Sequence, residues 1–166
     1  MNAVDPYAAV DRRREIDRLL GNYSEDHRNP ANAAVHHVCV PLIVWALVAA
    51  LWCIPVAPGV GKPGLWAALA MVGALGYYLR LSRPIGVAAL ALFVVLGAVT
   101  DLLYRTLGAP GLLLLAASVF VLAWVGQFIG HAWEGKRPSF LTDLVYLLIG
   151  PIWIVAKALR RLGIAY

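Results

Sequence analysis

Charged residues are scarce in this chain: Asp, Glu, Lys and Arg make up 14% of its 166 residues, whereas 61% are hydrophobic. A soluble domain of this length cannot bury so much apolar surface, so the composition excludes an ordinary soluble protein. The net charge of +5 resides in loops and chain ends. No basic stripe carries interleaved aromatic residues, which argues against nucleic-acid binding. We therefore predict an integral membrane protein that contacts the lipid bilayer.

Cysteine is scarce as well. Cys39 and Cys53 lie fourteen residues apart in one apolar run. On a single helix they cannot meet to form a disulfide, and we interpret them as small packing residues. Residues 1–37 also lack the apolar core of a signal peptide, so we expect the first membrane helix to direct insertion.

Long apolar runs dominate the rest of the chain. Four of them, each near the ~20 residues needed to cross a bilayer, cover 33–54, 64–81, 85–104 and 111–132. Their short connections predict an antiparallel bundle of four transmembrane helices, and hence an all-α integral membrane protein. We expect one membrane-embedded domain over 1–166, with the helical bundle at 33–161.

A fifth apolar run, 140–159, has Gly150-Pro151 at its centre. Because proline interrupts the hydrogen-bond ladder of a helix, this run either crosses with a kink or enters and returns as a re-entrant or interfacial hairpin. The sequence leaves both alternatives open.

Residues 1–30 form an amphipathic segment. Asp5-Pro6 is a favourable helix start. Apolar side chains then recur at helical spacing, at Ile16, Leu19, Leu20 and Tyr23. Such a helix lies on the membrane surface or packs across the ends of the bundle.

Histidine occurs only four times, in two stretches of the chain. Pro30 makes Asn29 a helix boundary. On the helix that follows, Asn32 and His36 share a face, whereas His37 points about 100° away. We therefore expect His36, and not His37, to face a site. The break at Asn29-Pro30 allows His27 to bend back toward it.

The second stretch pairs His131 with Glu134, three residues apart on one helical face. Ionisable groups at membrane depth are costly and are candidates for function. The alternative is a helix end that reaches the headgroups, with Trp133 as an interfacial anchor. Three imidazoles and one carboxylate with open positions are typical of a non-haem iron(II) site, and zinc is also chemically sensible. So few histidines predict one ion per chain.

Four crossings between the two stretches return the chain to its starting side, so both stretches face one compartment. The N-terminal segment and the loops on that side hold nine Lys and Arg residues, against Lys62 and Arg105 on the other side. This asymmetry predicts that the metal site faces the cytoplasm. We expect a bacterial inner membrane or a membrane like that of the endoplasmic reticulum.

Two motifs resemble a known family. They read His27-x-Asn29-Pro30-x-Asn32-x-x-x-His36 and Gln127-Phe128-Ile129-Gly130-His131-x-x-Glu134-x-x-Arg137-Pro138. Together they are similar to the fungal "metabolism of phytosphingosine to odd-numbered fatty acids" family, whose members are described as 2-hydroxy fatty acid dioxygenases. The chain departs from the fungal pattern at Arg28, where that pattern has a second histidine.

The resemblance implies an iron(II)-dependent α-oxidation that uses dioxygen as co-substrate to shorten a long-chain 2-hydroxy fatty acid by one carbon. It assigns the metal to His27, His36, His131 and Glu134, with Glu134 as the catalytic carboxylate or an immediate neighbour of the ion. Polar side chains able to orient the imidazoles are Asn29, Asn32, Gln127 and Asp143. Candidates to receive the substrate carboxylate are Arg28, Lys136 and Arg137.

Two other functions stay open at this point. In a zinc-dependent membrane lipid hydrolase, Glu134 acts as general base instead of ligand. In a non-catalytic scaffold or lipid carrier, the histidines are structural. The sequence also leaves an oligomer open.

Overall fold

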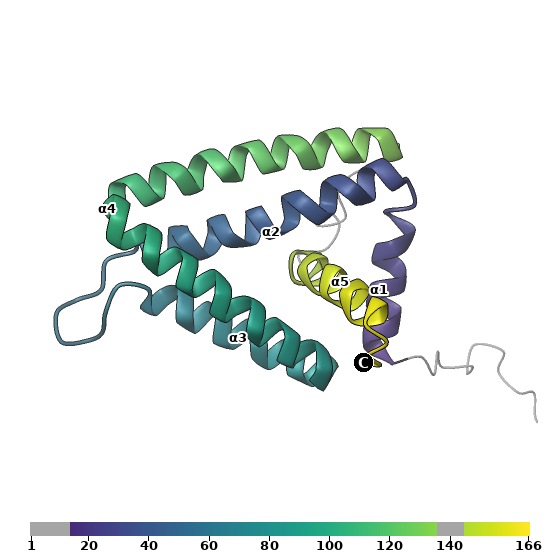
Figure 1. Ribbon diagram of the computed structural model, residues 1–166, viewed down its shortest axis with the longest axis horizontal. Helices are drawn as coiled ribbons and strands as arrows, with labels where there is room; N and C mark the ends of the chain where they lie inside the picture. Colours follow the sequence, from purple (N-terminus) through teal and green to yellow (C-terminus); the bar gives the residue numbers. More distant parts are fainter. Residues whose placement is uncertain (1–13, 136–144) are drawn as a thin grey trace, which may run out of the picture.

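The computed structural model describes residues 14–135 and 145–166. In these two ranges every regular element is an α-helix (Figure 1). The helices are α1 (Glu15–Glu25), α2 (Pro30–Trp52), α3 (Leu65–Leu81), α4 (Arg83–Glu134) and α5 (Tyr146–Arg161). The prediction of an all-helical fold is confirmed for this part of the chain. The proposed helix start at Asp5-Pro6 lies outside the described residues.

The start of α2 follows from its first residues. Asn29 is the N-cap, and its side chain accepts a hydrogen bond from the backbone N–H of Ala31 at 2.9 Å. Pro30 occupies the first helical position, where its missing N–H costs nothing. The predicted boundary at Asn29-Pro30 is confirmed, and it turns the chain between His27 and His36.

Helix α4 contains both the third and the fourth apolar run. Within the predicted connection at 105–110, two helices meet at a kink at Gly108, and α4 denotes both of them together. This residue has φ 67° and ψ 174°, a conformation that side chains disfavour and that glycine adopts freely. Figure 1 shows the two halves of α4 diverging from a sharp bend, one beside α3 and the other beside α2.

Two helices, α2 and α4, are long and apolar enough to cross a membrane by length and composition. Helix α3, with 17 residues, is a shorter apolar helix. The four-crossing topology stays a prediction, although the helices coincide closely with the four apolar runs.

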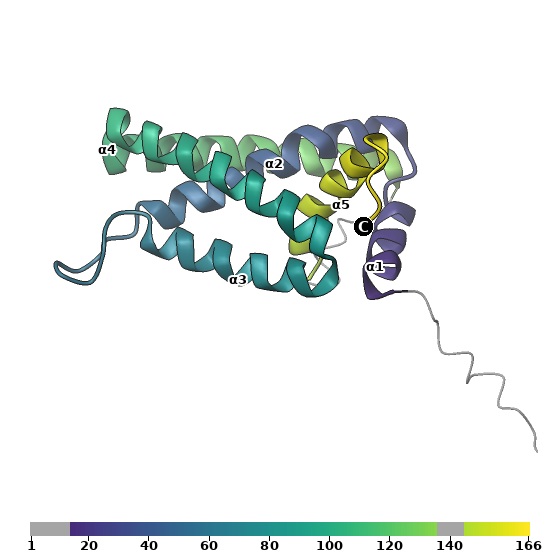
Figure 2. The same ribbon diagram turned by 60° about the horizontal axis from the view of Figure 1, so that its bottom comes forward.

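Helices α1 and α5 close one end of the molecule (Figure 2). The apolar face of α1 is buried against α5, which contributes Ile149, Ile152, Trp153 and Ala156 to a shared core. We expected α1 either to lie on the membrane surface or to pack across the ends of the bundle; in the structure it packs within the fold. The described part of the fifth run is a single helix of 16 residues with Pro151 inside, rather than a hairpin.

The second half of α4 lies along α2, and this pair carries the site. Ala46 and Ala49 of α2 pack against Leu112 and Ala116 of α4. Small residues let helix backbones approach closely. Both cysteines are free, as predicted.

Candidate metal centre

Three buried histidines meet at the end of the molecule where α1, α2 and α4 converge. His27 lies between α1 and α2, His36 on α2 and His131 near the end of α4, with exposed fractions of 5%, 2% and 3%. One ring nitrogen from each lies within 4.8 Å of the others. Residues that are 104 positions apart in the chain thus form a compact set of nitrogen donors.

The orientation of two of these rings is set by backbone carbonyls. Nδ1 of His27 is 2.6 Å from the carbonyl oxygen of Tyr23, and Nδ1 of His36 is 3.2 Å from that of Asn32. A carbonyl only accepts, so each Nδ1 carries the proton and donates it. Each Nε2 is then left with a free lone pair, the arrangement found in metal-binding histidines.

These two lone pairs point at each other, because the Nε2 atoms of His27 and His36 are 2.8 Å apart. Two lone pairs at that distance repel unless a proton or a cation lies between or beside them. A zinc-like ion with bonds of about 2.1 Å places two nitrogens about 3 Å apart when they subtend a right angle. Burial also lowers the pKa of His27, against the raising effects of the Tyr23 carbonyl, Asp26 and Glu134. A neutral imidazole is the form that binds a metal.

His131 completes the set. Its ring centroid lies 5.1 Å from that of His27 and 5.0 Å from that of His36. Its Nδ1 is buried and has no hydrogen-bond partner among the described residues. An unpaired buried nitrogen is costly, and an ion bound at Nδ1 is one partner that would relieve that cost. The donor set therefore fits a single divalent transition metal.

Glu134 does not join this set of donors. Its carboxylate accepts hydrogen bonds from the backbone N–H of Arg28 at 3.0 Å and of Asn29 at 3.1 and 2.9 Å. It also accepts one from the side-chain amide of Asn32 at 3.0 Å. The negative charge thus lies at the N-terminus of α2, which favours anions. In this structure Glu134 ties the end of α4 to the start of α2.

The asparagines expected to orient the imidazoles act differently from one another. The Asn32 side chain donates to Glu134, and it is the backbone carbonyl of Asn32 that contacts His36. The Asn29 side chain caps α2 and donates to the carbonyl of Trp133 at 3.2 Å. Both residues position the helices that carry the histidines.

His37 lies on another side of α2. Its Nδ1 bonds to the carbonyl of Ala33, and its ring lies 5.3 Å from that of Trp153. It is not in the three-histidine group. The Arg28 side chain is exposed. Asp143, Lys136 and Arg137 lie outside the described residues, so their predicted roles stay predictions.

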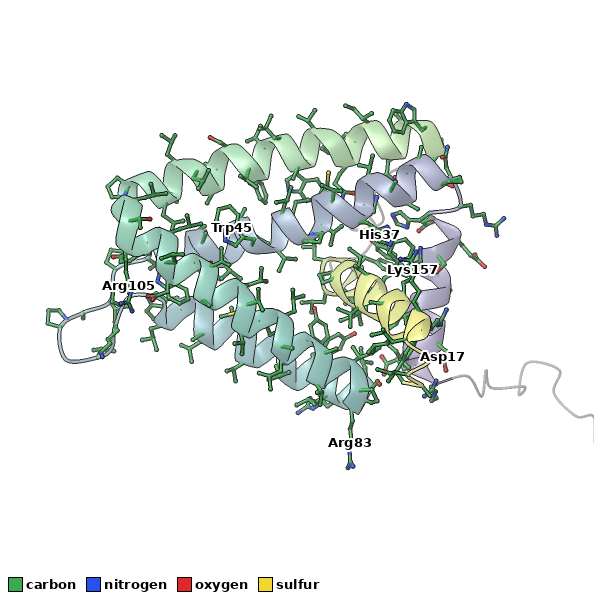
Figure 3. All side chains as sticks on the ribbon, viewed as in Figure 1. Asp17, His37, Trp45, Arg83, Arg105 and Lys157 are labelled. Carbon is green, nitrogen blue, oxygen red and sulfur yellow. The ribbon has the colours of Figure 1, made fainter. Side chains whose placement is uncertain are left out.

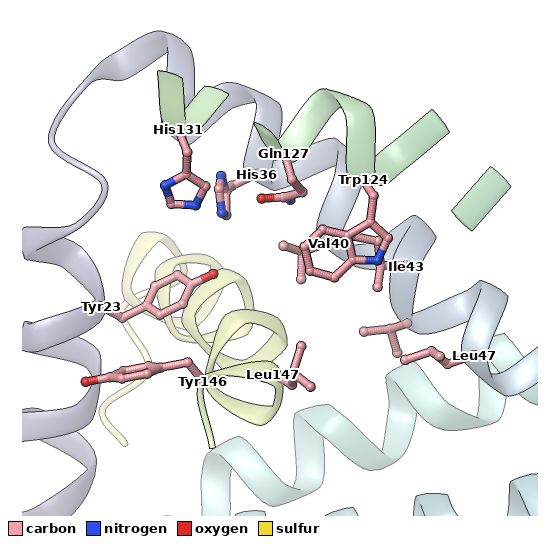
Figure 4. Close-up of a pocket in the computed structure, with 11 residues that line it drawn as sticks. Tyr23, His36, Val40, Ile43, Leu47, Trp124, Gln127, His131, Tyr146 and Leu147 are labelled. Carbon is pink, nitrogen blue, oxygen red and sulfur yellow. The ribbon is translucent and has the colours of Figure 1, made fainter. Parts of the chain in front are cut away.

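A cavity of about 70 Å³ opens beside the histidines (Figure 4). His36, His131, Gln127 and Tyr23 line its polar end, and the remaining wall is largely apolar. Gln127 is 4% exposed, and its Nε2 is buried without a hydrogen-bond partner among the described residues. Gln127 therefore lines the cavity with an amide whose hydrogen-bonding capacity is not fully used among the described residues.

Sequence comparison bears on this site directly. Residues 14–162 match the family described as Mpo1-like, 2-hydroxy-palmitic acid dioxygenase Mpo1-like. The chain belongs to the Mpo1-like family. It is also 27% identical over 156 residues to the protein named 2-hydroxy-palmitic acid dioxygenase MPO1 of Saccharomyces cerevisiae, covering 90% of this chain and 82% of the yeast protein. No solved structure gives a significant match.

The matched range of the Mpo1-like chain contains all three clustered histidines, Glu134 and Gln127. The family resemblance drawn from the two motifs is thus confirmed.

Two features of this Mpo1-like site went unnoticed in the sequence. Tyr23 was assigned only to the apolar face of its helix, yet it lines the cavity and stacks on His27 with centroids 4.3 Å apart. Gly126 and Gly130 bring α4 against α2: a Cβ built on Gly130 would meet Oδ1 of Asn32 at 2.6 Å. Their spacing of four residues, typical of close helix contacts, was the available signal.

Proposed function

We propose that this Mpo1-like chain is an iron(II)-dependent dioxygenase that shortens long-chain 2-hydroxy fatty acids by one carbon through α-oxidation. The observation that carries the proposal is the cluster of His27, His36 and His131, which opens into a cavity with an otherwise apolar wall. The name of the yeast relative, 2-hydroxy-palmitic acid dioxygenase, supports a 2-hydroxy fatty acid as substrate and dioxygen as co-substrate.

The overall reaction balances with dioxygen as the oxidant. The bond between C1 and C2 of the acid breaks, C1 leaves as carbon dioxide, and C2 becomes the carboxyl carbon of the shorter acid. C1 gives up one electron and C2 three, and the four electrons reduce one dioxygen, of which one oxygen enters the new carboxyl group and the other leaves as water. When bound, iron(II) supplies electrons to activate dioxygen and open positions for the acid.

The residues of the chain then have distinct tasks. His27 and His36 offer Nε2 to the ion, and the carbonyls of Tyr23 and Asn32 keep these rings in place. Gln127 donates N–H groups to the polar end of the acid, for which it has no competing partner among the described residues. The apolar wall of the cavity excludes bulk water from the reacting carbons.

The two other functions are less well supported. A zinc hydrolase needs a free carboxylate as general base, but the Glu134 carboxylate is occupied by N–H donors from Arg28, Asn29 and Asn32. A scaffold or carrier gives no reason for burying two imidazoles whose lone pairs meet at 2.8 Å.

We further propose that residues 1–166 form one membrane-embedded domain whose metal site faces the cytoplasm. Figure 3 shows Arg105 at the end of the molecule opposite to His37 and Lys157. The arrangement of basic residues in space therefore agrees with the asymmetry that predicts orientation.

The decisive experiment combines metal content with turnover. We expect the purified chain to hold one iron, and to consume dioxygen with long-chain 2-hydroxy acids while releasing the acid one carbon shorter. The matching acid without the hydroxyl serves as control and should give no uptake, because it cannot chelate the metal through two oxygens. Equal oxygen uptake with both acids, or activity that requires zinc alone, contradicts the proposal.

A further inference from the structure

A second, larger hollow adjoins the histidine cavity. It has a volume of about 330 Å³ and lies among α2, α3, α4 and α5. The two hollows share three lining residues, Val44, Leu47 and Leu147. Figure 4 shows Leu47 and Leu147 on the side of the histidine cavity that lies away from His131. A ligand that leaves the cavity past these side chains enters the second hollow, which we name the acyl groove.

The lining of the acyl groove indicates what it can hold. Its walls include Val48, Leu51, Met71 and Phe93. The one lining side chain with a hydroxyl group is Tyr78. Its hydroxyl donates a hydrogen bond to the carbonyl of Leu148 at 2.9 Å, so its proton is not available to a ligand. No lining side chain offers a ligand a free polar group, so the matching occupant is a hydrocarbon chain.

The dimensions suit one long acyl chain. Along α2, Val44 is eight residues and Leu51 fifteen residues beyond His36, which corresponds to about 12 and about 22 Å at the rise of an α-helix. A bilayer core of about 30 Å holds two acyl chains end to end, so one chain spans about 15 Å. A chain of about 15 Å whose head lies at the histidines therefore passes Val44 and enters the groove, and only a longer chain reaches Leu51.

We propose that the acyl groove binds the hydrocarbon tail of the 2-hydroxy acid and that its far end, at Leu51, Ala70 and Met71, limits the length of chain the enzyme accepts. This inference rests on the proposed function for the nature of the head group. Helix α3 begins at the end of the molecule away from the histidines and runs back toward them (Figure 1). Ala70 precedes Tyr78 along α3, so Ala70 lies nearer the far end of the groove.

Photolabelling tests the location of the tail without requiring turnover. The probe is a long-chain 2-hydroxy acid with a diazirine on its last carbon, irradiated with the full chain in nanodiscs. We expect crosslinks at Leu51, Ala70 and Met71 that excess unlabelled 2-hydroxy acid removes. Crosslinks confined to the exposed faces of α4, or crosslinks that added phospholipid removes and the 2-hydroxy acid does not, overturn the groove as a substrate site.

A matched pair of variants tests the limit on chain length. Ala70 is exposed in the groove, so Ala70→Phe fills its far end without disturbing the core. We expect kcat/KM for long acids to fall at least about tenfold relative to short ones. Ala91→Phe is the control, since Ala91 is exposed on α4 and lines neither hollow. An unchanged ratio in Ala70→Phe, or an equal change in both variants, overturns the proposal.

The two measurements separate this inference from the proposed function. If excess 2-hydroxy acid removes crosslinks in the groove but the chain consumes no oxygen, the tail site is supported and the dioxygenase function is rejected. If the chain consumes oxygen but the crosslinks lie outside the groove, the dioxygenase function is supported and the tail site is rejected.

Discussion

The carboxylate of Glu134 accepts the backbone N–H of Asn29 with both of its oxygens, at 3.1 and 2.9 Å. The last residue of α4 is thereby joined to the N-cap of α2. His131 lies one turn before Glu134, and His27 lies two residues before Asn29. This contact, together with those from Arg28 and Asn32 to the same carboxylate, holds the two histidine stretches relative to each other.

Glu134→Gln should weaken iron binding without removing a ligand. Glutamine keeps the size but presents an NH₂ group where Asn29 or Asn32 donates, so one or two hydrogen bonds are lost. We expect iron affinity to fall about 10- to 100-fold, as for other residues that support metal ligands. Competition with a chelator measures it, and the spectrum of the iron-loaded protein should stay that of the parent. Glu15→Gln, at the far end of α1, is the control; a changed ligand-field spectrum in Glu134→Gln would make Glu134 a ligand.

Replacing His27, His36 or His131 by Ala should abolish iron retention, because each contributes one of three clustered nitrogens. Membrane insertion should persist, since it depends on apolar runs elsewhere. His37→Ala is the matched control, because His37 faces Trp153 and should leave the iron content unchanged. Metal analysis of the four purified variants tests this assignment. If His37→Ala loses iron and His36→Ala retains it, His37 is the ligand and His36 is not.

Gln127→Leu should separate substrate binding from stability. The amide N–H groups of Gln127 are buried without a partner among the described residues, so leucine removes a desolvation cost and the free energy of unfolding should stay equal or rise. We expect KM for the 2-hydroxy acid to rise about tenfold or more, corresponding to about 1.5–3 kcal/mol for a hydrogen bond to a charged group. Iron content should not change.

Gln127→Glu provides a second comparison for the same residue. Its negative charge opposes the carboxylate of the substrate, so KM should rise further than in Gln127→Leu. A lower KM in the Glu variant than in the Leu variant would exclude contact between residue 127 and that carboxylate.

Gly130→Ala should separate α2 from α4 beside the metal site. The added Cβ meets Oδ1 of Asn32, which is 0% exposed, so the Asn32 side chain must shift against its hydrogen bond to Glu134. We expect a loss of about 1–3 kcal/mol in stability, typical of overpacking, together with weaker iron retention. Gly73→Ala, where nothing lies within 4 Å of the new atom, should be neutral or stabilising by about 0.5–1 kcal/mol. Thermal unfolding in detergent compares the pair, and equal Tm values would contradict the close contact.

Much of the helical architecture could be predicted from the sequence, because helix formation is a local property. The apolar runs gave the extents of α2, α3 and both halves of α4, and Pro30 marked the start of α2. The spacing of Ile16, Leu19, Leu20 and Tyr23 identified the face of α1 that is buried. Local patterns left some features open: the connection at 105–110 is a kink at Gly108 between two helical halves, and the described part of the fifth run is one helix.

The sequence by itself determined which residues could form a site; only the tertiary structure decided how they meet. Spacing along a helix places His36 beside Asn32, but it cannot tell that His36 and His27 approach to 2.8 Å. Nor can it assign Glu134 to the backbone N–H of Asn29, 105 residues away. Such contacts depend on how closely α4 packs on α2, which Gly126 and Gly130 allow by leaving room for Cys39 and Asn32. The acyl groove arises in the same way, from the space left where α2, α3, α4 and α5 converge.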